Sequence, residues 1–209
     1  MLNKRIIINV GRQLGSGGGM IAKMLANDFH YTLYDKEILN LAAKESGFSE
    51  KFFEQNDEKG RLLKSLFHMH APHISDNNFY RSRFSEESLF QFQSDAIRKV
   101  AKDGGCVFVG RCADYVLRDF EDVVNIFITA NIEDRIKMVR ERHQCDEEAA
   151  KKIINQKENA RASYYNFYTG KKWGYSDNYH LCVNSSLLGL EGTVEFIKHF
   201  IMCKYDGKE

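Results

Sequence analysis

Proline, long apolar runs and an excess of either charge are scarce in this chain. Its 209 residues include one proline, Pro72, and no proline- or serine-rich stretch that would divide the sequence into independent domains. No apolar run approaches the roughly 20 residues that a membrane-spanning helix needs. The formal net charge is +1, so overall charge gives no reason to expect a nucleic acid or a membrane surface as a partner.

Cysteine is present but shows no pairing pattern. The cysteines are odd in number and scattered, which is typical of reduced thiols in a cytosolic protein: Cys106, Cys112, Cys145, Cys182 and Cys203. The charged segment 1–5 lacks the apolar core of a signal peptide, so we expect a cytoplasmic location. Hydrophobic residues make up 43% of the chain, enough for a soluble globular protein with a substantial core.

Short β-branched runs alternate with helical patterns along the chain. Strands are predicted over 4–10, 31–34, 106–109, 123–128 and 180–184, and helices over 19–29, 86–102, 132–143, 146–166 and 190–203. This alternation predicts an α/β protein of three layers, α/β/α, in which a five-stranded parallel sheet is covered by helices on both faces. Right-handed crossovers would bring the carboxyl ends of the strands together at one edge.

We expect residues 1–209 to form one domain with two additions. Residues 36–90 are largely polar and helical, and we interpret them as a helical insert. Residues 132–178 carry many charges of both signs and then a run of aromatic residues, and we interpret them as a lid region. The alternative for the charged part is a solvated helix face, and the alternative for the aromatic part is packing on the core.

A glycine-rich turn follows the first predicted strand and leads directly into a helix. The turn spans Gly11–Gly19 and ends in Gly15-Ser16-Gly17-Gly18-Gly19. Backbone N–H groups exposed by glycines, together with a helix N-terminus, form a concave site for anions such as phosphate. The alternative interpretation is a flexible strand-to-helix turn without a ligand.

This loop lacks two residues of the usual phosphate-binding pattern, G-x-x-x-x-G-K-[ST]. Alignment on that pattern places Arg12 at the first glycine, Gly18 at the lysine and Gly19 at the Ser/Thr. The backbone cradle can survive these changes, but the lysine charge and the hydroxyl that usually holds Mg²⁺ are missing. We hypothesise that Arg12 supplies the charge from the front of the loop; Lys23, one helical turn beyond Gly19, is a weaker candidate.

Charged residues also follow other predicted strands at the same edge. Arg111, after Gly110, is placed to bind a phosphate with both arms of its guanidinium, although it can equally pair with Asp114 at the surface. Asp35 and Asp114 can hold Mg²⁺ through water or hydrogen-bond a ribose, and each can equally cap a helix. In the lid region, Arg135, Arg140 and Arg161 are candidates to neutralise transferring phosphates.

Together these motifs resemble the cytidylate kinase-like family, whose members are relatives of bacterial cytidylate kinase among the nucleoside monophosphate kinases. The resemblance spans nearly the whole chain and is carried by segments 12–18, 34–39, 109–115, 126–130, 161–165 and 184–186. It implies a phosphate-loop kinase fold with strand order 2-3-1-4-5. It also implies transfer of a phosphoryl group from ATP, with Mg²⁺, to a nucleoside monophosphate, CMP or dCMP being the leading acceptor.

The resemblance also implies roles for individual residues. Gly15, Ser16, Gly17 and Gly18, with Gly19 after them, would cradle the phosphates of ATP. Asp35 would face the acceptor nucleoside, which the insert 36–90 helps to bind, and it is the one candidate metal ligand. Arg111 would bind the acceptor phosphate beside Asp114. Arg161 would be the arginine of the lid, with Arg135 and Arg140 on the preceding helix as further catalytic groups. Arg12 at the loop is a catalytic candidate by the hypothesis above rather than by the resemblance.

Three departures from the family pattern leave the activity open. Cytidylate kinase has a lysine where this chain has Gly18, a hydroxyl residue where it has Gly19, and an acid where it has Val109. One alternative is therefore a catalytically weak or inactive nucleotide sensor, and another is a small-molecule kinase with a different acceptor. The expected partners are small-molecule nucleotides, with no nucleic acid and no membrane, and the sequence does not predict an oligomeric state.

Overall fold

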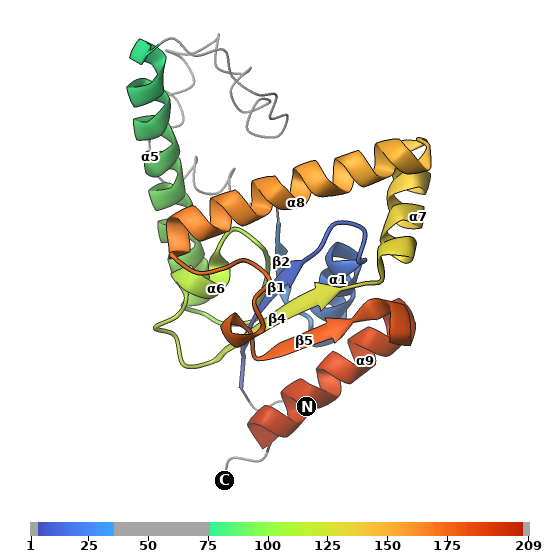
Figure 1. The fold of residues 1–209 in the computed structure, drawn as a ribbon. Helices are drawn as coiled ribbons and strands as arrows, with labels where there is room; N and C mark the ends of the chain where they lie inside the picture. The colour runs from blue at the N-terminus through green and yellow to red at the C-terminus, as the bar shows by residue number, and fades with distance from the viewer. Residues whose placement is uncertain (1–3, 36–75, 207–209) are drawn as a thin grey trace. The chain divides into compact units, whose positions relative to one another are not determined.

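The computed structural model describes residues 4–35 and 76–206 (Figure 1). The chain divides into two compact units, one formed by residues 1–35 with 100–209 and the other by residues 36–99. Most of the predicted insert 36–90 lies outside the described residues. Its described part is the beginning of α5 (Asp76–Ala101). Further along this helix, Arg98 Nη1 lies 3.1 Å from Asp95 Oδ1.

A five-stranded parallel sheet forms the centre of the first unit. Its strands lie in the order β2-β3-β1-β4-β5, which confirms the predicted α/β fold and strand order. The strands are β1 (Ile7–Arg12), β2 (Thr32–Tyr34), β3 (Cys106–Val109), β4 (Val123–Thr129) and β5 (Leu181–Asn184). The helices that follow them are α1 (Gly18–Phe29), α6 (Ala113–Val116), α7 (Ile132–His143), α8 (Glu147–Thr169) and α9 (Ser185–Asp206).

Both faces of the central strands β1, β3 and β4 are largely buried, which explains their nearly continuous apolar sequences. Alternate residues of the central strands, such as Ile8 and Val107, join one cluster with residues of α1 and α9. On the opposite face, Phe127 is 2% exposed, and its ring centroid lies 5.3 Å from that of Trp173 and 4.8 Å from that of Tyr179. Trp173 of the lid region therefore packs on the core, as does Tyr179 just beyond it.

Helices α7 and α8 form a hairpin with a small apolar core of their own. Ile136 and Val139 of α7 meet Ala150 and Ile154 of α8, and Leu14 of the glycine-rich loop packs against this cluster. Helix α8 begins where Asp146 accepts a hydrogen bond of 2.8 Å from the Ala149 N–H. The contact of Leu14 joins the loop to the predicted lid.

Most predicted bounds agree with the observed ones, and β1 and α9 depart from them for local reasons. The helix predicted over 86–102 begins earlier, since α5 runs from Asp76 to Ala101. Strand β1 continues to Arg12 because it pairs with β4 as far as Ile128. Helix α9 begins with a turn at Ser185 and is kinked at Gly189, which has φ 68°, so the predicted start at 190 marks its second part. The short helix α6 was not predicted. Among residues 4–35 and 76–206, no helix is long and apolar enough to cross a membrane.

Candidate functional site

The glycine-rich loop leaves the sheet at Arg12 and enters α1 at Gly18. Gly17 caps the helix with φ 72°, a left-handed conformation that favours glycine. Gly15 has φ 81°, and a Cβ there would lie 2.6 Å from the backbone oxygen of Arg135 in α7. Glycine is thus required at these two positions for conformation and, at Gly15, for close approach to a neighbouring helix.

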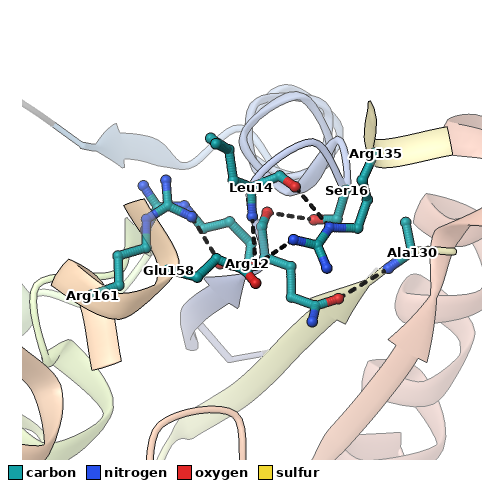
Figure 2. Close-up of polar contacts among 8 residues, drawn as sticks. Arg12, Leu14, Ser16, Ala130, Arg135, Glu158 and Arg161 are labelled. Carbon is teal, nitrogen blue, oxygen red and sulfur yellow. Dashed lines mark hydrogen bonds and ion pairs between the residues drawn. The ribbon is translucent and has the colours of Figure 1, made fainter. Parts of the chain in front are cut away.

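Side-chain donors form hydrogen bonds to carbonyl oxygens of the loop (Figure 2). Arg161 Nη1 donates to the Arg12 oxygen at 3.0 Å, and Arg135 Nε donates to the Leu14 oxygen at 2.8 Å. Ser185 Oγ donates to the Ser16 oxygen at 2.8 Å. By contrast, within the described part of the chain the N–H groups of Gly17, Gly18 and Gly19 have no acceptor. The loop therefore presents donors, as an anion-binding loop must.

Ser16 contributes to the loop through its backbone. Its hydroxyl is buried and donates to the Gln13 oxygen at 3.0 Å, so it is committed to holding the turn. The structure places Gly15, Ser16, Gly17, Gly18 and Gly19 in one continuous turn at the N-terminus of α1, as the sequence predicts for a phosphate cradle. Whether phosphate binds there remains a proposal.

Four of the five candidate arginines lie beside the loop, and three of them act on one another's charges, while Arg135 contacts the loop from α7. Arg12 comes from the end of β1, Arg111 follows β3, and Arg161 reaches in from α8. Burial lowers the pKa of Arg12 to about 10, and the charges of Arg161 and Arg111 act in the same direction, opposed by Asp35. Burial also lowers the pKa of Arg161, with Arg111 again contributing. We call Arg12, Arg111 and Arg161 the arginine cluster.

Asp35 is the carboxylate of this cluster. Its Oδ1 lies 3.9 Å from Arg12 Nη2, and its side chain is 43% exposed. Among the described residues, Asp35 acts on the charges of Arg12 and Arg161. Glu158 also acts on Arg161, but it pairs with Arg135 as well. Positive charge is thus in excess in this partly buried place, and an anion would offset it. The cluster is therefore an electrostatic complement to a polyphosphate.

The backbone that carries Arg111 is strained. Gly110, Arg111 and Cys112 all have positive φ, at 72°, 60° and 55°. Non-glycine residues in this region cost on the order of 1 kcal/mol each, and such strain concentrates at functional sites. The turn ends β3 and begins α6, and it directs Arg111 into the cluster rather than along a regular helix.

Arg135 has a different environment from the cluster. It is 5% exposed, donates to the Leu14 oxygen, and its Nη2 lies 2.6 Å from Glu158 Oε1. The same Glu158 oxygen accepts a bond of 3.2 Å from the Leu14 N–H. Both backbone polar groups of Leu14 are thus held by α7 and α8 (Figure 2). We call this set of Leu14, Arg135 and Glu158 the loop brace.

The remaining candidates lie apart from the cluster. Arg140 is exposed towards the C-terminal end of α7, where its charge acts on Glu147 at the start of α8. Asp114 accepts a hydrogen bond of 2.6 Å from the Tyr165 hydroxyl, so its carboxylate is tied to α8. Desolvation raises the pKa of Asp114 even though this bond lowers it. Neither residue is brought to the glycine-rich loop by a described contact.

A metal ion fits here only as a partner of bound phosphate. Among the residues that the structure describes, no group of three or more acidic, histidine or cysteine side chains gathers round Asp35 or elsewhere. Mg²⁺ is commonly held by one or two carboxylates, water and substrate phosphates rather than by a full protein cage. Asp35 beside a phosphate-binding loop is compatible with that arrangement.

Sequence reasoning missed the loop brace and the bond between Tyr165 and Asp114. Glu158 is one of many acids in a charged stretch, and Leu14 is an ordinary apolar residue in a loop. Their contacts join residues 144 positions apart, which no local pattern reveals. Ser185 lies in segment 184–186, so the resemblance had drawn attention to it without giving a role.

The sheet order, the glycine-rich loop and the helices around them define the class of fold as that of the phosphate-loop kinases. A solved shikimate kinase from Bacteroides thetaiotaomicron shares this fold, with a TM-score of 0.51 and 13% identity over 95% of this chain and 99% of that one. An uncharacterized protein from Eubacterium ventriosum ATCC 27560 is more similar, with a TM-score of 0.71 and 27% identity over 94% of this chain and 98% of that one.

Within this class, the chain belongs to the cytidylate kinase-like family. The model of that family matches residues 7–187, from β1 to the first turn of α9. No curated protein matches the sequence. The family assignment confirms the resemblance found in the sequence, while the acceptor and the activity belong to the proposal that follows.

Proposed function

We propose that this protein transfers the terminal phosphoryl group of ATP to a nucleoside monophosphate, with CMP or dCMP as the leading acceptor. The observation that carries the proposal is the arginine cluster beside a loop in which the oxygens of Arg12, Leu14 and Ser16 accept hydrogen bonds, while among the described residues the N–H groups of Gly17, Gly18 and Gly19 have no acceptor. Family membership supports the same reaction class.

The loop would bind the donor. The N–H groups of Gly17, Gly18 and Gly19 would donate hydrogen bonds to phosphate oxygens, and the positive end of α1 would add to their effect. Phosphoryl transfer needs positioning and charge neutralisation more than covalent chemistry from the protein. Oriented backbone donors that need no rearrangement supply both.

The arginine cluster would neutralise charge on both substrates. Arg111, held on a strained turn, would grip the acceptor phosphate with its guanidinium fork. Arg161 would act from α8 on the transferring group, in the manner of an arginine finger, which is worth about 10³- to 10⁵-fold in rate in other phosphotransferases. Helices α7 and α8, held to the loop by the brace, would exclude water from the reacting atoms.

Asp35 would serve the acceptor and the metal. Its carboxylate can hydrogen-bond a ribose hydroxyl of the acceptor or hold Mg²⁺ through water. When bound, Mg²⁺ would neutralise part of the phosphate charge and help to align the two substrates. Asp114 and Arg140 are less suited to direct contact, since their described interactions are with Tyr165 and Glu147.

A transfer assay tests the proposal. Purified protein with Mg-ATP labelled at the γ-phosphate is given CMP, dCMP, UMP, AMP or GMP, and the labelled diphosphate is separated and counted. We expect transfer to CMP or dCMP. Arg111→Gln should reduce kcat/KM by about 100-fold or more, because a charge-assisted bidentate contact is lost. Arg142→Gln on the exposed side of α7 is the matched control and should transfer normally.

The failures of this assay are informative in different ways. Folded protein that binds ATP but labels none of the five acceptors would contradict monophosphate kinase activity. It would favour a nucleotide sensor or a kinase with another small-molecule acceptor. Folded protein that does not bind ATP would contradict every version of the proposal.

A further inference from the structure

Two departures from the usual phosphate-loop pattern lie in contact with one another. Arg12 stands where the pattern has its first glycine, and Gly18 stands where it has lysine. A Cβ on Gly18 would lie 2.5 Å from Arg12 Cβ and 3.0 Å from Arg12 Cγ. No side chain fits at position 18 while Arg12 is in place, because backbone-proximal atoms of this kind cannot move aside as the tip of a side chain can.

The arginine side chain lies in a slot that a second glycine completes. The stem of Arg12 passes over Gly18, and a Cβ on Gly110 would collide with Arg12 Nη1. The guanidinium is therefore placed where β1 and β3 end, next to the loop and to Arg111. Its Nη2 lies 3.9 Å from Asp35 Oδ1, at the limit of an ion pair. Its side chain is only 21% exposed, although it carries a full charge.

The charges around the slot favour the binding of an anion. Arg161 and Arg111 both disfavour the charged form of Arg12, and among the described residues Asp35 is the acid that favours it. A buried cation among other cations destabilises a fold unless something compensates. A residue serving only stability would not be placed in this way.

We propose that Arg12 and Gly18 are the two halves of one reciprocal exchange. The residue that carries the phosphate-binding cation is the first of the loop pattern instead of the seventh. The positive charge that binds the terminal phosphates of ATP would thus be moved to another position of the loop rather than lost. Arg12 would contact those phosphates directly. An arginine also offers two parallel donors, where a lysine offers a point charge. This inference rests on the proposed function.

A cycle of variants tests the exchange: Arg12→Gly, Gly18→Lys and the double variant with both. Calorimetry gives the dissociation constants for ATP and AMP, and the transfer assay gives the rate. We expect Arg12→Gly to weaken ATP binding by about 10- to 100-fold, because a charge-assisted contact is lost. Gly18→Lys alone should also weaken it, through the collision with Arg12. The double variant should recover most of the affinity.

A matched double variant separates charge from packing. Arg12→Gly with Gly18→Met fills the slot from the same side without a cation, and it should bind ATP no better than Arg12→Gly. Arg12→Met keeps the stem over Gly18 and removes the charge, so it tests the claim even if the double variants fold poorly. Circular dichroism and thermal melting show which variants are folded.

Three results would overturn the exchange. These are ATP binding by Arg12→Met at the wild-type level, a double variant with lysine that binds no better than Arg12→Gly, or equal recovery with methionine. If the wild-type protein binds ATP and transfers phosphate while the variants give one of these results, the proposed function stands and the exchange alone fails. If the wild-type protein binds no ATP, the proposed function fails instead, and the exchange fails with it.

Discussion

Asp114 illustrates how a single partly buried carboxyl responds to its place in this fold. Its oxygen accepts a 2.6 Å hydrogen bond from Tyr165, a residue that is 5% exposed. Desolvation nevertheless dominates and raises the pKa of Asp114. The folded state therefore binds this proton more tightly than the unfolded chain does, so the protonated form favours folding and the ionised form disfavours it.

Asp114→Asn should increase stability in a pH-dependent way. Asparagine keeps an acceptor for the Tyr165 hydroxyl and removes the charge. In the wild type, the contribution of Asp114 is fully present below its ordinary pKa of 3.8 and is lost as the pH rises through the raised value. We expect the variant to be more stable by about 1 kcal/mol at pH 7 and progressively less so towards pH 4. Urea unfolding at several pH values measures this; an advantage that grows as the pH falls would contradict it.

Arg12 should cost stability in the ligand-free protein. Burial and like charges lower its pKa to about 10, so the charged form is disfavoured in the folded state. At pH 7 the side chain is charged in both the folded and the unfolded state, so the full cost to stability is present. This cost would be relieved only as the pH rises from about 10 towards 12.5. Arg12→Met should raise the free energy of unfolding by on the order of 1 kcal/mol at pH 7 while weakening ATP binding. A clear loss of stability would instead indicate a structural role.

At the scale of elements, the first turn of α1 contains two adjacent glycines in opposite environments. Gly18 is buried under Arg12, while a Cβ on Gly19 would meet nothing within 4 Å. Glycine within a helix is less favourable than alanine by about 0.5–1 kcal/mol. The same substitution at neighbouring positions should therefore have opposite signs.

Gly19→Ala should stabilise the protein by about 0.5–1 kcal/mol, and Gly18→Ala should destabilise it by about 1–3 kcal/mol. The first gains helix propensity without a clash, whereas the second forces Arg12 from its slot. Urea unfolding of both variants under one condition provides the measurement, each serving as the control for the other. Equal effects would show that the slot is not as tight as described.

The loop brace couples the hairpin of α7 and α8 to the loop. Its contacts are the 2.6 Å approach of Arg135 Nη2 to Glu158 Oε1 and the bonds of both residues to the backbone of Leu14. The side chain of Arg135 is 6% exposed and that of Glu158 is 19% exposed, so their charges are poorly screened by solvent. Loss of the acid would leave a buried cation next to the arginine cluster.

Glu158→Gln should destabilise the protein by about 2–3 kcal/mol and weaken ATP binding. Glutamine can still accept the Leu14 N–H bond, so the change isolates the charge. Glu141→Gln on the exposed side of α7 is the matched control and should stay within about 0.5 kcal/mol of the wild type. Thermal and urea unfolding with ATP calorimetry test this, and a variant as stable as the control would contradict the brace.

The elements were predictable where local pattern decides structure. The apolar run of β3 and the charged helical pattern of α7 predicted their observed bounds, 106–109 and 132–143. The left-handed turn at Arg111 and Cys112 was not predictable, because non-glycine residues adopt it only when their surroundings impose it. The placement of Arg12 in its slot could be suspected from the missing lysine, but the collision that explains Gly18 is visible only in three dimensions.

At the scale of the whole molecule, a nearly neutral chain produces a strongly positive site. The net charge is +1, yet folding brings Arg12, Arg111 and Arg161 together from β1, the end of β3 and α8. Composition therefore says little about the partners of such a protein, since the local field depends on which charges meet. The polyphosphate preference proposed here is a property of the fold rather than of the overall charge.

Binding of ATP, ADP and AMP to the wild-type protein is the most direct test of this account. Calorimetric titrations at low and high salt give the three dissociation constants. If the loop and the arginine cluster form a polyphosphate site, affinity rises from AMP to ATP by about tenfold or more, and the difference shrinks with salt. Equal affinities for ATP and AMP, or no binding of ATP by folded protein, would contradict it.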